Sequence, residues 1–201
     1  MKKYIFPVIG LFLLITIRSV VAGLPSAAKD IQSGDYPSAI RELTHWAMSS
    51  DDTNNHKAAC ALGDLYLEGK GTTKNYDEAW KWYSLASSLG NARAKSMLGL
   101  MCAQGLGRPQ DMQKAEEYWK TAAEFGETSA QINLAVLYAG EKSIIEKQVE
   151  ALTWAIIASR DGSDEKLVDE AFRISEKLTL KLSKEKCLEA KEKAKNFIKK
   201  D

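Results

Sequence analysis

The sequence contains few of the residues that build metal centres, disulfide scaffolds or phosphate-binding surfaces. Its 201 residues include only two histidines and three widely spaced cysteines, whereas a structural zinc site needs several such ligands and a disulfide scaffold is rich in paired cysteines. The 28 basic and 27 acidic residues nearly cancel, which argues against a nucleic-acid-binding protein. Four prolines and thirteen glycines are too few for a fibrous or loop-rich chain. We therefore expect an ordinary folded chain with no metal, no cofactor and no nucleic-acid partner.

The N-terminus has the layout of a secretory signal. Lys2 and Lys3 form a basic start, residues 8–17 are apolar apart from Thr16, and small or modest side chains lead to Ala22. We predict a signal peptide over residues 1–22, cleavage near Ala22, and a mature chain that is periplasmic or secreted. The alternative is a retained signal, but the apolar run is shorter than the roughly 20 residues that span a membrane. Cleavage would remove three basic residues and no acid, so the net charge of +1 would become −2 and no membrane partner is expected afterwards.

A repeat of 36 residues organises the rest of the chain. The first full copy carries its marker residues at Ala58, Leu62, Gly63, Gly69, Gly71, Ala79, Tyr83, Ala86 and Gly90. The second copy carries them at Ala94, Leu98, Gly99, Gly105, Gly107, Ala115, Trp119, Ala122 and Gly126. A third copy keeps Ala130, Leu134, Ala151, Ala155, Ala158 and Gly162. A fixed period of this length predicts stacked repeats rather than one irregular domain.

Each copy predicts two helices. In the first helix, Ala58 and Leu62 belong to an apolar stripe with helical spacing, and Gly63 lets a neighbouring helix approach closely. Gly69 and Gly71 end that helix, because glycine adopts positive φ without penalty. The repeated Trp-Tyr pairs at Trp82–Tyr83 and Tyr118–Trp119 predict a core between successive units. Trp80 falls outside the period, since positions 116 and 152 carry Glu and Leu, so it is a candidate exposed interface residue.

The pattern A-x-x-x-L-G-x-x-Y-x-x-G-x-G, followed by A-x-x-W-Y and a closing glycine, resembles the Sel1-like repeat, a relative of the tetratricopeptide repeat. The resemblance covers residues 56–91 and 92–127 closely. It is weaker over residues 128–163, where Glu141-Lys142-Ser143 replaces the G-x-G turn. It implies an all-α fold, a right-handed α/α solenoid of helix-turn-helix repeats.

Two flanking segments complete the predicted organisation. Residues 23–55 form a degenerate N-terminal repeat, with helices over about 25–33 and 37–48. We align Ala39 with Ala79, 40 residues later, and place the extra residues in the following polar loop; aligning Trp46 with Trp82 at 36 is the alternative. Residues 164–201 are predicted to be C-terminal capping helices, with Ser183 as an N-cap.

No residue pattern nominates a catalytic centre. His45 and His56 are far apart, with His56 at a predicted helix start, and the S-x-x-K strings at Ser26 and Ser183 lack the companion motifs of penicillin-recognising enzymes. We interpret the cysteines as buried apolar residues; a Cys60–Cys102 disulfide remains the alternative.

The resemblance places the first helices of successive repeats on a concave surface. We predict a protein-binding groove there, with an apolar middle and an acidic edge. Its candidate residues, together with Trp80, are Asp64, Glu68, Met97, Leu100, Asn133 and Val136. Ordinary packing is the alternative role for these positions.

Three functions remain open, and the family resemblance favours the first. That one is an exported, non-catalytic scaffold or adaptor that binds another protein. The second is a periplasmic immunity protein that neutralises a secreted toxin such as a phospholipase. The third is a cell-envelope hydrolase, for which the sequence nominates no residue.

Overall fold

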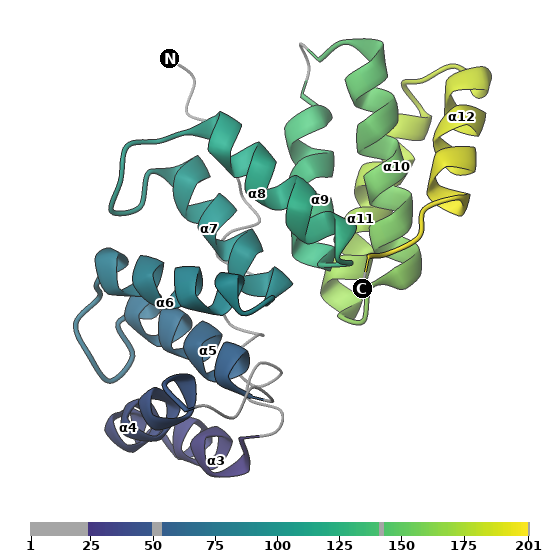
Figure 1. Ribbon diagram of the computed structural model, residues 1–201. Helices are drawn as coiled ribbons and strands as arrows, with labels where there is room; N and C mark the ends of the chain where they lie inside the picture. Colours follow the sequence, from purple (N-terminus) through teal and green to yellow (C-terminus); the bar gives the residue numbers. More distant parts are fainter. Residues whose placement is uncertain (1–23, 50–53, 141–142, 201) are drawn as a thin grey trace. The chain divides into compact units, whose positions relative to one another are not determined.

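The computed structural model describes residues 24–49, 54–140 and 143–200, and the predicted signal peptide lies outside them. This part of the chain consists of helices joined by turns and contains no strand (Figure 1). In chain order the helices are α3 (Pro25–Ser33), α4 (Tyr36–Ala47), α5 (Asn55–Glu68), α6 (Tyr76–Ser88), α7 (Ala92–Gln104), α8 (Met112–Glu124), α9 (Thr128–Tyr138), α10 (Ile145–Asp161), α11 (Glu165–Thr179) and α12 (Lys184–Lys195). The predicted fold class, an all-α array of helix pairs, is confirmed.

The helices belong to two compact units. The first runs up to Ala94 and includes residues 106–109, and the second comprises residues 95–105 and the chain from Gln110 onward. In the first unit α3 packs on α4, α4 on α5, and α5 on α6. In the second unit α8 packs on α9, and α10 contacts α9, α11 and α12. Neighbouring pairs therefore bury each other's apolar faces, as stacked repeats require.

Capping residues mark the period at the start of α4, α6 and α8, the second helices of the first three helix pairs. The Asn75 side chain accepts hydrogen bonds from the first turn of α6, and Asp111 does the same for α8, 36 residues later. Asp35 caps α4, 40 residues before Asn75, which confirms the 40-residue alignment of the degenerate repeat. Ser183 caps α12 as predicted. These side chains satisfy backbone N–H groups that a helix leaves without partners.

Gly63 and Gly99 allow the two helices of a repeat to meet at very short range. A Cβ atom on Gly63 would lie 2.5 Å from the Tyr83 ring, and one on Gly99 would lie 2.7 Å from the Trp119 indole. Tyr83 and Trp119 are completely buried. The predicted close approach is therefore confirmed, and the absence of a side chain on one helix makes room for the aromatic ring of the next.

A second glycine contact links consecutive repeats. Gly71 has a φ of 72°, and a Cβ there would lie 2.1 Å from the Cβ of Tyr36, at the start of α4. Gly107 also has a φ of 72°, and a Cβ there would lie 2.7 Å from the Cβ of Tyr76. Each turn thus lies directly against the aromatic residue that begins the second helix of the repeat before it.

The aromatic pairs are less uniformly buried than the sequence predicts. Tyr83 and Trp119 form core, but Trp82, Tyr118 and Trp154 are only half-buried. Trp154 packs edge-on against Phe197, with 5.4 Å between ring centroids. The predicted core position is therefore confirmed for the second member of each pair, whereas the first member is only half-buried.

Among residues 24–49, 54–140 and 143–200, no helix combines the length and the hydrophobicity that crossing a bilayer demands.

Candidate functional site

The predicted groove residues separate into interior and half-buried positions. Asp64 exposes 2% of its surface and Leu100 exposes 7%. Glu68, Met97, Asn133, Val136 and Trp80 are half-buried. The expected acidic edge is therefore corrected: the Asp64 carboxylate lies inside the first unit and does not face solvent. Leu100, expected in the apolar middle, is likewise an interior side chain.

Asp64 is the centre of a buried polar cluster from three helices. Its carboxylate accepts a hydrogen bond from the Tyr83 hydroxyl at 2.6 Å and pairs with the Arg93 guanidinium at 3.0 Å. Arg93 also donates to the Cys60 sulfur at 3.1 Å. Because α5 supplies Cys60 and Asp64, α6 supplies Tyr83 and α7 supplies Arg93, the cluster holds these three helices together.

Burial and the ion pair fix the charges in this cluster. Burial, and then the Asp64 charge, raise the pKa of Tyr83 far above its usual range. Burial opposes the charged form of Arg93, but Asp64 more than offsets it and raises the pKa of the guanidinium. The hydroxyl stays protonated and the guanidinium stays charged near neutral pH. The cluster therefore stabilises the fold and offers no group that exchanges protons with a substrate.

The next repeat fills the equivalent positions with neutral groups. Thirty-six residues after Cys60 and Arg93, the Ser96 and Ser129 hydroxyls hydrogen-bond at 2.9 Å. Leu100 replaces Asp64, and Trp119 replaces Tyr83 and donates its indole N–H to the Ser96 carbonyl at 3.1 Å. Ion pair and neutral contact thus serve the same packing position in different repeats, which supports the packing role for Asp64 and Leu100.

Trp80 lies beneath a cation. The Arg108 guanidinium is 4.3 Å from the centroid of the indole ring, close enough for a cation–π contact. Arg108 is exposed and Trp80 is half-buried. The tryptophan predicted to be isolated and exposed is therefore partly covered by the Arg108 side chain. Tryptophan and arginine are the residues most enriched at interface hot spots, and this pair remains a candidate contact for a partner.

A second polar network surrounds Glu116, which stands 36 residues after Trp80. Glu116 accepts a hydrogen bond from the Tyr138 hydroxyl at 2.6 Å and pairs with Lys120 at 2.7 Å. Lys147 lies 4.0 Å from the centroid of the Tyr138 ring. Burial alone would raise the pKa of Glu116, but the bonds from Lys120 and Tyr138 outweigh it and lower the pKa. The network joins α8, α9 and α10, and nothing in the repeat pattern predicts it.

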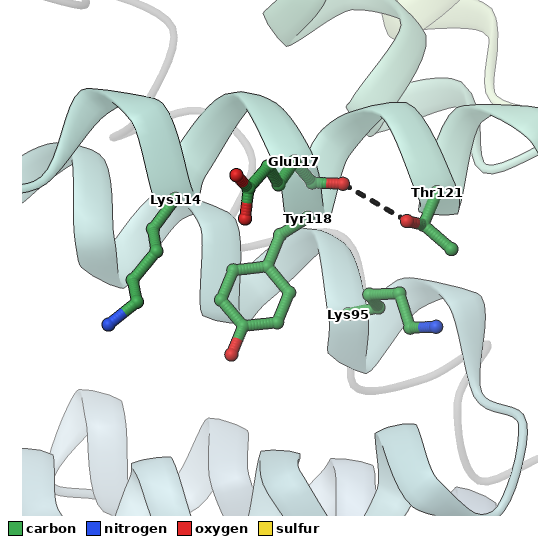
Figure 2. Close-up of a pocket in the computed structure, with 5 residues that line it drawn as sticks. All are labelled: Lys95, Lys114, Glu117, Tyr118 and Thr121. Atoms are coloured by element: carbon green, nitrogen blue, oxygen red, sulfur yellow. Dashed lines mark hydrogen bonds between the residues drawn. The ribbon is translucent and has the colours of Figure 1, made fainter.

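A half-open pocket lies between α7 and α8 of the second unit (Figure 2). Its volume is about 290 Å³, and it is lined by Lys95, Lys114, Glu117, Tyr118 and Thr121. Thr121 uses its hydroxyl within α8, donating to the Glu117 carbonyl at 3.0 Å. No sequence motif predicts this pocket. The available signal was the departure of Lys95 and Lys114 from the residues that the other repeats carry at those positions.

The histidine and cysteine residues do not form a reactive or metal-binding site among the described residues. His56 lies at the start of α5 as predicted, half-buried, with its Nδ1 3.1 Å from the Asn91 amide. Burial lowers the pKa of His56, which favours the neutral ring. The described residues contain no cluster of three or more His, Cys, Asp or Glu side chains suited to a metal ion. All three cysteines are buried thiols, with no Cys60–Cys102 disulfide.

The helix pairs, their 36-residue period and their turn glycines define an α/α helical-repeat protein. Within that class the chain belongs to the Sel1 repeat family, whose repeat matches residues 56–91, 92–126 and 128–163. Proteins of this family are generally protein–protein interaction scaffolds, and their fold is typically a non-catalytic module.

A solved structure of a Sel1 repeat protein supports this assignment. A Sel1 repeat protein from Oxalobacter formigenes is 30% identical, with a TM-score of 0.51 over 66% of this chain and 96% of its own. A protective antigen of uropathogenic Escherichia coli strains with an SLR fold, c5321, is 21% identical, with a TM-score of 0.47 over 80% of this chain and 41% of its own. The comparison with curated proteins returned no match.

Proposed function

We propose that the chain is an exported, non-catalytic module that binds another protein through the first helices of its Sel1 repeats. The observation that carries the proposal is the difference between its buried polar residues, which bond to other helices, and its groove residues, some of which stay partly accessible to solvent. Buried polar residues bond to side chains of other helices: Asp64 pairs with the half-buried Arg93, and Ser96 bonds to Ser129. The groove residues that stay partly accessible are Met97 on α7 and Asn133 and Val136 on α9.

Partly accessible apolar side chains on repeat helices suit a protein partner. A protein–protein interface has an apolar centre surrounded by polar residues, and an extended or helical segment binds in such a groove through a few anchoring side chains. Met97 and Val136 would supply the apolar centre, and Asn133 of the same unit would supply a polar contact. This arrangement needs no cofactor and no reacting group.

Replacing Met97 and Val136 by glutamate should abolish most of the binding to the partner. Two charges in an apolar interface centre should raise the dissociation constant at least about tenfold, which corresponds to a loss of about 1.4 kcal/mol of binding free energy. The measurement is affinity purification of the C-terminally tagged full chain from its native cell envelope, followed by titration of the partner identified with the wild-type chain.

A charge-matched control separates the interface from a general effect of added charge. Gln113→Glu/Asn196→Glu adds the same two charges at exposed positions and should bind like the wild type. Circular dichroism should show that both double variants are folded. Wild-type affinity in a folded Met97→Glu/Val136→Glu variant would remove the groove from consideration.

Export makes a separate prediction. The tagged chain should be recovered from the periplasmic or secreted fraction, with an intact mass that corresponds to a chain beginning at Gly23. Replacing Leu13 and Leu14 by lysine should break the apolar run and keep the chain in the cytoplasm with its full mass. A full-length wild-type chain in the cytoplasmic fraction would rule out the proposed export.

A further inference from the structure

The pocket between α7 and α8 has the charge and size of a site for one acidic side chain. Figure 2 shows the side chains of Lys114 and Tyr118 pointing to the same side of α8, with Lys95 of α7 on the other side of the Tyr118 ring from Lys114. Its volume, about 290 Å³, is at the lower end of small-molecule sites, which begin at about 300 Å³. A single side chain of a partner fits this space better than a large organic ligand.

Neither lysine of the pocket forms an ion pair among the described residues. Lys95 lies 6.0 Å from the centroid of the Phe125 ring, a weak contact. Lys114 extends away from the Glu117 carboxylate in Figure 2, although three residues separate them on the same helix. Elsewhere on the second helices such pairs do form, as between Glu78 and Lys81 on α6. The two ammonium groups are therefore available to an external anion.

Comparison of the three repeats shows that this basic pair is specific to the middle one. The residues equivalent to Lys95 are Ala59 and Gln131, and both are buried. The residues equivalent to Lys114 are Glu78 and Glu150, which pair with Lys81 and Lys147. The repeat pattern therefore explains neither lysine, whereas it explains most residues around them.

We propose that this pocket binds a carboxylate of an acidic segment in the protein partner. Lys95 and Lys114 supply the positive charge, and the half-buried Tyr118 ring supplies a surface for the methylene groups of a glutamate. Glu117 also lines the pocket, so its net formal charge is +1, which matches one carboxylate better than a doubly charged phosphate. The inference rests on the proposed function and specifies the chemistry of the partner.

The test uses a fluorescein-labelled short polyglutamate peptide and the full-length chain. Fluorescence anisotropy should detect binding to the wild type, and Lys95→Glu/Lys114→Glu should weaken it at least about tenfold, because like charges repel the carboxylates. Lys114→Gln, a change at an exposed position, should weaken it about threefold. A polyglutamine peptide of equal length should not bind, and sodium chloride should weaken polyglutamate binding.

The matched control is Lys191→Glu, which reverses the charge of an exposed lysine on α12. It should leave peptide binding unchanged. No binding to the wild type, equal binding to the double variant, or an equal loss in Lys191→Glu would overturn the proposal. Sodium phosphate that competes far better than sodium chloride of equal ionic strength would also overturn it, in favour of a phosphate site.

The two proposals fail separately. A partner that binds wild type and Lys95→Glu/Lys114→Glu equally leaves the interaction module in place and removes the carboxylate pocket. If polyglutamate binds through the two lysines but the partner is insensitive to Met97→Glu/Val136→Glu, the carboxylate pocket stands and the proposed groove is removed. Circular dichroism and the melting temperature of each variant identify any loss of fold, for which Lys114→Gln is the least disruptive substitution.

Discussion

Asp64→Leu should lower the free energy of unfolding by about 3 kcal/mol, because it removes the buried carboxylate that pairs with the partly buried Arg93 guanidinium. Asp64 also accepts a hydrogen bond from the Tyr83 hydroxyl at 2.6 Å. The substitution therefore also removes the acceptor of a fully buried hydroxyl group. Urea unfolding followed by circular dichroism measures the change. We expect a clear drop in the midpoint concentration, with secondary structure in water retained.

The second repeat supplies the control for this experiment. Asp64→Leu/Arg93→Ser copies the residues that Leu100 and Ser129 provide at the equivalent positions. The double variant contains no guanidinium that has lost the Asp64 carboxylate, so it should be more stable than Asp64→Leu by about 1 kcal/mol. The Tyr83 hydroxyl loses its Asp64 acceptor in both variants, so the free-energy cost of that loss is the same in both and does not affect their difference in stability. Equal stability of the two would show that the ion pair is not what holds the helices together.

Gly63→Ala should destabilise the chain by about 1–3 kcal/mol, the usual cost of overpacking a core. Alanine favours a helix over glycine by about 1 kcal/mol, so a net loss would show that the steric effect outweighs the helical one. The Tyr83 ring cannot withdraw easily, because it is fully buried and its hydroxyl is bonded to Asp64. Thermal unfolding measures the change.

Two further glycines calibrate that result. Gly99→Ala should behave like Gly63→Ala, since its Cβ would lie 2.7 Å from the Trp119 indole, whose N–H is bonded to Ser96. Gly140→Ala should be nearly neutral, because the nearest atom would be 3.5 Å away. If Gly63→Ala were as stable as the wild type, the close helix approach would not depend on glycine.

Repeat periodicity predicts the fold well because each unit solves the same packing problem. The shared positions, such as Gly63 with Gly99 and Tyr83 with Trp119, follow from the backbone geometry of a helix pair and are visible as a 36-residue period. The half-burial of Trp82 and Tyr118 is not visible in that way. A period identifies equivalent positions, but the exposure of each depends on the particular side chains that neighbouring helices provide.

The candidate site was harder to predict for a related reason. The acidic edge of the groove was predicted at Asp64 because the family resemblance places the first helices of the repeats on the concave surface. Its partner Arg93 is 29 residues away, and no local spacing rule connects them. Paired departures from the repeat are the signal that would have found them, since Asp64 and Arg93 are charged where the second repeat has Leu100 and Ser129.

The contact between turn glycine and tyrosine has a consequence for how such an array can lengthen. Residues 56–91 contain both halves of it, Gly71 in the turn and Tyr76 at the start of α6. A tandem duplication of this block would place the glycine of the new copy against the tyrosine of the old one. Residues 92–127 contain Gly107 but carry Met112 at the tyrosine position, and the third repeat has Ser143 in place of the glycine. The close atoms of both tyrosines are Cβ and backbone atoms, which Met112 also has, so among the three repeats it is the third, with Ser143 at the glycine position, that lacks one half of this contact.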